Sequence, residues 1–195
     1  MGKRTLVRRR GRGGKQFRAI IVGKIAPAKY PNFKLEEHHF GEVIDIVHER
    51  GRDAPLAKIK FDDGRYSYVP APEGTVVGST IELGTGTVAK GGNIMALESI
   101  PDGTIVCNIE RNAGDGGKLI KAAGSSAVVF AHGTEGVTIK FPSGKFLLLN
   151  SKNRAMVGAI SGSGRKEKPF LKAGTRAKFM QAHGRLYPTV RGIAQ

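Results

Sequence analysis

The sequence predicts a mainly β protein, in which two small barrels follow one another between two strongly basic segments. Short runs of alternating apolar and polar residues, typical of half-buried strands, recur from residue 41 onwards. Glycine supplies 28 of the 195 residues and proline another 9, which indicates many turns and few long helices. Because short antiparallel strands lose their exposed edges best by closing, we expect barrels.

The first set of strands occupies residues 37–84. Ala57, Ile59 and Phe61 alternate with lysines and therefore lie on one face of a strand. An Asp-Gly pair follows directly and is a strong signal for a hairpin turn. The strands expected in this set are residues 44–46, 57–61, 66–69 and 80–83, and the set ends near residues 84–86.

The second set occupies residues 85–160 and has the same alternation with glycine-containing turns. Cys107 is expected to be a small buried side chain on the same face as Ile105 and Ile109. Ala173, Ala177 and Met180 recur at helical spacing, which predicts one short helix over residues 172–182. The strands expected here are residues 104–109, 126–131, 137–141 and 145–149.

The positive charge is separated from the strands. The formal net charge is +16, and the isoelectric point is about 10.3. Residues 1–34 carry +11, residues 35–160 carry −2, and residues 161–195 carry +7. We therefore expect basic extensions over residues 1–36 and 161–195 that bind a polyanion such as RNA. A soluble tail, a localisation signal or a solvated helix face would explain parts of these extensions without RNA.

The expected RNA contacts are basic side chains of the two extensions and of a glycine-rich loop at residues 114–118. Guanidinium groups bind phosphate in a bidentate way, and lysines add point charges. Three aromatic residues among the first basic side chains, Phe17, Tyr30 and Phe33, could stack on unpaired bases or seal a packed arm. The expected contacts are Arg4, Arg8, Arg9, Arg10, Arg12, Lys15, Arg18, Lys118, Lys121, Arg165, Lys166, Lys168, Lys172, Arg176, Lys178, Arg185 and Arg191.

No nucleotide-binding, metal-binding or catalytic site is expected from the sequence. The glycine-rich loop lacks the spacing and the hydroxyl of a phosphate-binding Walker motif, because Leu119 follows its lysine. That loop is either a purely structural turn or a close approach of the backbone to RNA. The five histidines and single cysteine have no spacing of a closed zinc site, and no acid–base pair is evident. We expect no enzyme, cofactor, metal or small-molecule substrate, and no membrane segment, which favours the cytoplasm.

Several motifs together resemble one family, the second ribosomal protein of the large subunit in its archaeal and eukaryotic form. They include residues 51–57 (Gly-Arg-Asp-Ala-Pro-Leu-Ala), 91–94, 100–104, 114–118 and 164–174. The resemblance implies an oligonucleotide-binding-fold barrel followed by an SH3-like barrel, with extensions threaded into 23S-type rRNA. It also implies support for subunit association, tRNA binding and the peptidyl-transferase centre, with neighbouring large-subunit proteins and the small subunit as partners.

Two features depart from that family pattern. Members usually continue beyond the motif at residues 190–192 into a glycine-rich loop with a histidine near the catalytic RNA, whereas this sequence ends at Gln195. The glycine-rich loop commonly begins with proline, where this sequence has Asn112 and Ala113. An RNA-modifying enzyme, a free translation factor and a chromatin protein are the competing classes of function.

Overall fold

The fold comes from a computed structural model that describes residues 9–34, 37–191 and 193. The chain forms two compact units. The larger unit contains Ala26–His48 and Arg52–Arg165 and holds all the strands. The smaller unit contains the described parts of Met1–Ile25 and Lys166–Gln195 together with Glu49–Gly51.

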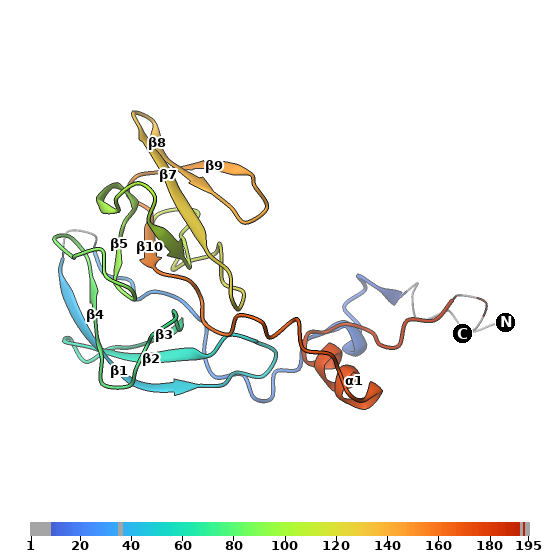
Figure 1. The fold of residues 1–195 in the computed structure, drawn as a ribbon. Helices are drawn as coiled ribbons and strands as arrows, with labels where there is room; N and C mark the ends of the chain where they lie inside the picture. Colours follow the sequence, from blue (N-terminus) through green and yellow to red (C-terminus); the bar gives the residue numbers. More distant parts are fainter. Residues whose placement is uncertain (1–8, 35–36, 192, 194–195) are drawn as a thin grey trace. The chain divides into compact units, whose positions relative to one another are not determined.

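The larger unit is built on a ladder of ten strands in the order β3-β2-β1-β4-β5-β10-β6-β7-β8-β9 (Figure 1). Neighbouring strands are antiparallel except β4 and β5, which are parallel. The mainly β fold is confirmed, and it agrees with an oligonucleotide-binding fold followed by an SH3-like barrel. The strands are β1 His39–Val47, β2 Leu56–Phe61, β3 Tyr66–Pro70, β4 Thr80–Leu83, β5 Ile94–Ala96, β6 Ile105–Cys107, β7 Ala127–Gly133, β8 Gly136–Lys140, β9 Phe146–Leu149 and β10 Arg154–Val157.

The first half of the ladder encloses one apolar core. The expected hairpin is confirmed: β2 pairs with β3, and Gly64 between them has a φ of +85° that favours glycine. Ala57, Ile59 and Phe61 are buried, as their alternation predicted. Tyr30 and Phe33 belong to the same core. The segment before β1, residues 26–34, is therefore a packed arm that these two aromatic residues seal.

The second half of the ladder encloses another core, which includes Leu97 from the short 3-10 helix η3 (Leu97–Ser99). The four strands expected here are present as β6 to β9. The sequence did not reveal β5 or β10. Both are short, and every residue of each is buried, so neither has the alternation that marks a half-exposed strand.

The prediction that Cys107 shares a face with Ile105 and Ile109 is wrong. Strand β6 ends at Cys107, and Asn108 has a φ of +47°, which breaks the alternation of the strand. Cys107 consequently packs in the first core and Ile109 in the second, while Ile105 remains about half exposed. The burial expected for Cys107 itself is confirmed.

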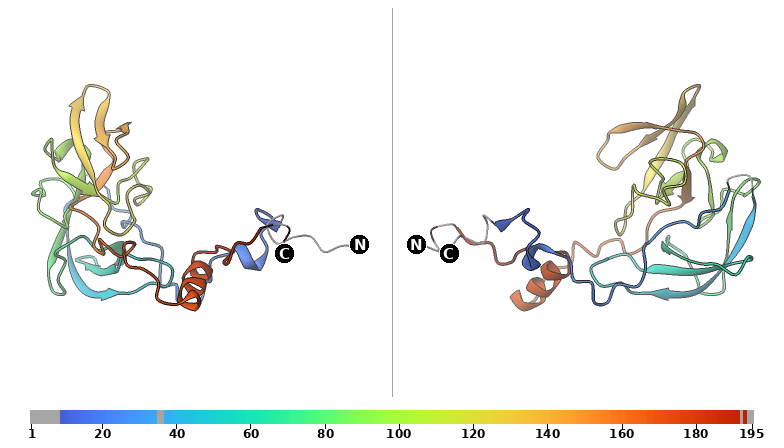
Figure 2. Two further views of the ribbon diagram at one scale, coloured as in Figure 1. Left: turned by 45° about the vertical axis from the view of Figure 1, so that its right-hand side comes forward. Right: turned by 180° about the vertical axis from the view of Figure 1, so that it is seen from behind.

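The smaller unit contains the 3-10 turn η2 (Lys15–Phe17) and the helix α1 (Ala173–Ala182). The expected short helix is thus confirmed within one residue. Both views of Figure 2 show the N-terminal segment (blue) running beside the C-terminal segment (red). Parts of the two basic extensions therefore meet in one unit, although 124 residues separate the extensions in sequence.

Candidate nucleic-acid interface

Contacts along the backbone join the two basic extensions. Gly184 has a φ of +68°, and a Cβ placed on it would lie 2.7 Å from the backbone nitrogen of Ala19. The loop Glu49–Gly51 is part of the same junction: the Arg50 nitrogen donates to the Gly23 carbonyl at 3.1 Å. The Lys24 Nζ lies 3.5 Å from a carboxylate oxygen of the buried Glu49. No local sequence pattern indicates this junction, because each contact joins distant segments.

A groove of about 510 Å³ lies between the joined extensions. Four of the expected RNA contacts line it, and no acidic residue does. Such a groove attracts anions, because nearby cations of one sign add their fields. The complete lining is Lys15, Gln16, Arg18, Ile20, Ala177, Lys178, Gln181, Arg185, Leu186 and Tyr187.

A second hollow of about 550 Å³ lies beside α1. The expected contacts Lys166, Lys168, Lys172 and Arg176 line it, with Glu167 as its one acidic lining residue among those described. The Arg176 guanidinium lies 5.0 Å from the centre of the Tyr187 ring, at a distance typical of a cation–π contact. These cations are therefore arranged around a shared aromatic side chain.

The other expected contacts of the extensions lie outside both hollows. Arg9, Arg10 and Arg12 are exposed around a turn near the start of the described chain, and Arg165 and Arg191 are exposed as well. Arg4 and Arg8 lie outside the described residues.

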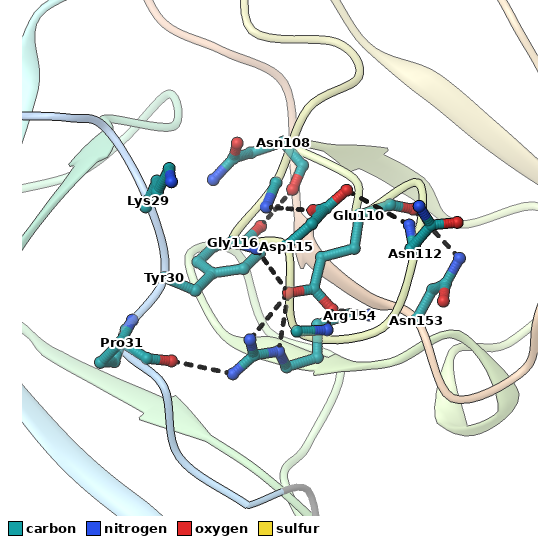
Figure 3. A network of polar contacts seen from close by, with 12 residues as sticks. Lys29, Tyr30, Pro31, Asn108, Glu110, Asn112, Asp115, Gly116, Asn153 and Arg154 are labelled. Atoms are coloured by element: carbon teal, nitrogen blue, oxygen red, sulfur yellow. Dashed lines mark hydrogen bonds and ion pairs between the residues drawn. The ribbon is translucent and has the colours of Figure 1, made fainter.

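The glycine-rich loop is fixed from inside the larger unit (Figure 3). The buried Glu110 carboxylate accepts hydrogen bonds from the backbone nitrogens of Gly114 at 3.3 Å and Gly116 at 2.9 Å. The Asp115 carboxylate accepts from the nitrogens of Arg111 and Gly117 at 3.1 and 2.9 Å. These N–H groups are used within the protein, which favours the structural-turn interpretation for the loop backbone.

Arg154 of β10 connects this loop to the arm. Its guanidinium contacts the Glu110 carboxylate with a nearest distance of 2.7 Å, and it also donates to the Pro31 carbonyl at 3.0 Å. The Tyr30 hydroxyl donates to the backbone carbonyl of Asn108 at 2.6 Å. Burial, together with the nearby Cys107 and Glu110, raises the pKa of Tyr30 well above its ordinary value. The position of the arm before β1 is thus tied to the loop.

Two expected contacts border the loop, and they differ in exposure. Lys118 is exposed. Lys121 is half-buried, and its Nζ donates to the carbonyls of Ala28 and Gly117, the latter at 3.0 Å. Burial lowers the pKa of Lys121 to about 8, and the charges of Arg52, Lys118 and Lys29 contribute to the shift. Four cations therefore gather where the loop meets the arm.

The part of the chain that the structure describes contains neither a cluster of metal ligands nor a reactive thiol. No group of three histidine, cysteine or acidic side chains there could hold a metal ion. Burial raises the pKa of the Cys107 thiol to about 12, so this sulfur remains a protonated core side chain. No described helix is long and apolar enough to cross a membrane.

Sequence reasoning missed the buried pair of Glu110 and Arg154, and it missed Lys29, Arg52, Gln16 and Gln181 as parts of these surfaces. For the pair, the available signal was a single charge beside each of two short and mostly apolar runs, residues 105–109 and 155–157. The other residues had no such signal, because their neighbours come from distant segments.

Comparisons with known proteins cover the whole chain. Residues 2–83 match the family "Ribosomal Proteins L2, RNA binding N-terminal domain", and residues 90–195 match "Ribosomal Proteins L2, C-terminal domain". The "Large ribosomal subunit protein uL2" of Nitrosopumilus maritimus is 57% identical over 196 residues, covering 100% of this chain and 80% of the relative. The protein of the same name from Cenarchaeum symbiosum is 58% identical over 195 residues, with the same coverage.

Proposed function

Because the chain belongs to the L2 family of large-subunit ribosomal proteins, in its archaeal form, we propose that it is a primary binder of 23S-type rRNA. Membership of this family makes it a structural, RNA-binding ribosomal component and not an enzyme. In the proposed role it supports subunit association, tRNA binding and the architecture of the peptidyl-transferase centre. Its proposed partners also include neighbouring large-subunit proteins and the small subunit, in the cytoplasm.

The observation that carries the proposal is the groove between the joined basic extensions. Its four cations come from both ends of the sequence and face one hollow without an acidic neighbour in the lining. An RNA backbone supplies the closely spaced negative charges that such an arrangement attracts. The junction at Gly184 and Glu49–Gly51 holds the cations together, so fewer degrees of freedom are lost on binding.

The proposed RNA contacts are those expected from the sequence, including Arg4 and Arg8. The surface around Lys118 and Lys121 forms a second contact region, strengthened by Lys29 and Arg52. We propose that residues 37–84 and 85–160 act as the two barrels and that residues 1–36 and 161–195 act as basic extensions. The two matched family regions, which end at residue 83 and begin at residue 90, support a boundary near residue 85.

The proposal is tested by the salt dependence of RNA affinity. Neutralising several phosphates releases counterions, so the affinity for a large-subunit rRNA fragment should fall steeply as salt rises. A variant in which Lys15, Arg18, Lys178 and Arg185 become alanine should bind more weakly and with a shallower slope. A control variant, Lys140→Ala with Lys145→Ala in the hairpin of β8 and β9, removes two charges instead of four, and it should change the slope less for each charge removed. A flat salt dependence of the unaltered protein would contradict the proposal.

Sedimentation separates the competing classes of function. A tagged chain should remain with the large subunit in a sucrose gradient at high salt, because a primary rRNA binder is held by many contacts. A free translation factor or a chromatin protein would leave the subunit under those conditions.

A further inference from the structure

The groove between the extensions contains more than cations. Gln16 and Gln181 contribute two amides, which can both donate and accept hydrogen bonds. Ile20, Ala177 and Leu186 contribute an apolar part of the lining. A surface that only follows phosphates needs neither feature, because contacts to phosphate are mostly made by charged and donor groups.

Tyr187 gives the groove an aromatic wall. Tyr187 lines both the groove and the second hollow, whereas Arg176 lines only the second hollow. The Arg176 guanidinium lies 5.0 Å from the centre of the Tyr187 ring, and this cation–π contact restrains the ring. A ring fixed in this way is suited to stacking with a flat ligand.

We propose that the groove binds one unpaired nucleotide of the RNA, with its base against Tyr187 and its phosphate on the surrounding cations. The proposal rests on the RNA-binding function proposed above and specifies the form of RNA that this site recognises. The cations are Lys15, Arg18, Lys178 and Arg185. The amides of Gln16 and Gln181 then meet the polar edge of the base, which an unpaired base exposes.

Size and charge both favour this ligand. The groove volume of about 510 Å³ falls within the range of sites that enclose a small molecule, and a nucleotide is a ligand of that size. A base inside a duplex is stacked and paired, so it cannot enter such a hollow. An acidic peptide would match the cations, but it would not supply a flat ring that uses Tyr187 and the two amides together.

The site exists only where the two extensions meet. Lys15, Gln16, Arg18 and Ile20 come from the N-terminal segment, and the remaining lining residues come from α1 and the segment after it. The close approach of Gly184 to Ala19 lies at this junction. Recognition of an unpaired nucleotide should therefore require both extensions in one chain.

The first experiment uses small probes and the full chain. Nucleoside monophosphates, ribose 5-phosphate and inorganic phosphate are added separately while the side-chain amide signals of Gln16 and Gln181 and the ring signals of Tyr187 are followed by NMR. Nucleoside monophosphates should shift all three residues. Equal shifts with inorganic phosphate or ribose 5-phosphate would overturn the proposal, because the base would then have no role.

The second experiment compares two RNA hairpins that differ only in one bulged nucleotide. The protein should prefer the bulged hairpin, and Tyr187→Ala should reduce that preference by about tenfold, since one base–aromatic stack is lost. Tyr187→Phe keeps the ring and should keep the preference. Tyr66→Ala removes an exposed tyrosine from β3 in the larger unit and serves as the matched control.

Different outcomes separate the two proposals. Equal binding of both hairpins by the unaltered protein, or an equal loss on both in Tyr187→Ala, would overturn the nucleotide site alone. The RNA-binding function itself fails if neither hairpin nor a large-subunit rRNA fragment binds in a salt-dependent way.

Discussion

The carboxylate of Glu110 and the guanidinium of Arg154 form a buried ion pair, with 2.7 Å between Oε1 and the nearer terminal nitrogen. Glu110 is fully buried, and Arg154 is 2% exposed. The carboxylate also accepts hydrogen bonds from the backbone of the glycine-rich loop, and the guanidinium donates to the arm at Pro31. One charge pair therefore holds together two segments that border the proposed RNA surface (Figure 3).

Replacing Glu110 with alanine should strongly destabilise the larger unit. The change leaves a buried, uncompensated guanidinium and frees the loop N–H groups, so the free energy of unfolding should fall by about 3–5 kcal/mol. Chemical denaturation followed by circular dichroism measures this loss. Glu135→Ala removes an exposed carboxylate and should change stability by less than about 0.5 kcal/mol. A loss in Glu110→Ala no larger than in this control would contradict the prediction.

The ion pair also marks the limit of what the sequence could predict. The hairpin of β2 and β3 was predictable, because its alternation and its Asp-Gly turn are local signals. Strand β10, which contains Arg154, was not predictable, because its four residues are all buried and its neighbours β5 and β6 are distant in sequence.

The candidate site shows the same division between local and distant information. The cations of both extensions were recognisable from composition alone. Their meeting in one groove depends on Gly184 packing against Ala19, a contact between residues 165 positions apart that no local pattern indicates. Gln16 and Gln181 can be recognised as lining one groove only once that contact is known.

Replacing Gly184 with alanine should separate the extensions and weaken RNA binding. The new Cβ would lie 2.7 Å from the Ala19 nitrogen, and the φ of +68° is unfavourable for alanine. A left-handed conformation costs a residue other than glycine about 1–2 kcal/mol, so affinity for an rRNA fragment should fall by about tenfold. Filter binding at fixed salt measures the change.

Gly174→Ala is the matched control for that substitution. Gly174 lies in α1, where a Cβ would meet no atom within 4 Å. Alanine there should stabilise the helix by about 0.5–1 kcal/mol and leave RNA affinity unchanged. If both variants bind RNA like the unaltered protein, the junction at Gly184 does not organise the interface.

The charge of Lys121 should make RNA binding depend on pH. Burial and the surrounding cations lower its pKa to about 8, so in free protein the amine loses its proton as pH rises through that value. A bound phosphate favours the charged amine, and binding above pH 8 must therefore be accompanied by proton uptake. Affinity for an rRNA fragment should decline between about pH 7 and pH 9.

Lys121→Arg separates this effect from general changes in the RNA or the protein. The guanidinium remains charged throughout that pH range, so the decline should be smaller in the variant. NMR titration of the Lys121 side chain should report a midpoint near pH 8 without RNA and a higher midpoint with RNA. An unchanged midpoint on adding RNA would show that Lys121 does not contact phosphate.

The pairing of His39 with Asp62 should stabilise the first barrel mainly in mild acid. Burial alone would lower the pKa of His39, but its hydrogen bonds with Asp62 and Glu37 give a net increase above 6.5. The pKa of Asp62 is lowered, chiefly by its hydrogen bond with His39 at 2.9 Å. The stabilisation by the His39–Asp62 pair is therefore fully present below pH 6.5, and it is lost as pH rises through the higher pKa of His39 in the folded protein. It is also lost in strong acid, where Asp62 becomes protonated.

The variant His39→Gln tests this pH dependence, because its free energy of unfolding can be compared with that of the unaltered protein at each pH. The unaltered protein should exceed the variant in free energy of unfolding by more at about pH 5.5 than at about pH 8. Taking the difference removes the similar contribution of His132, whose pKa is raised by the Leu97 carbonyl and by Asp102. The His39 ring also stacks on Phe33 with 3.8 Å between centroids, so part of the difference should persist at high pH. A difference that is the same at both pH values would mean that only this stacking, and not the charge, contributes to stability.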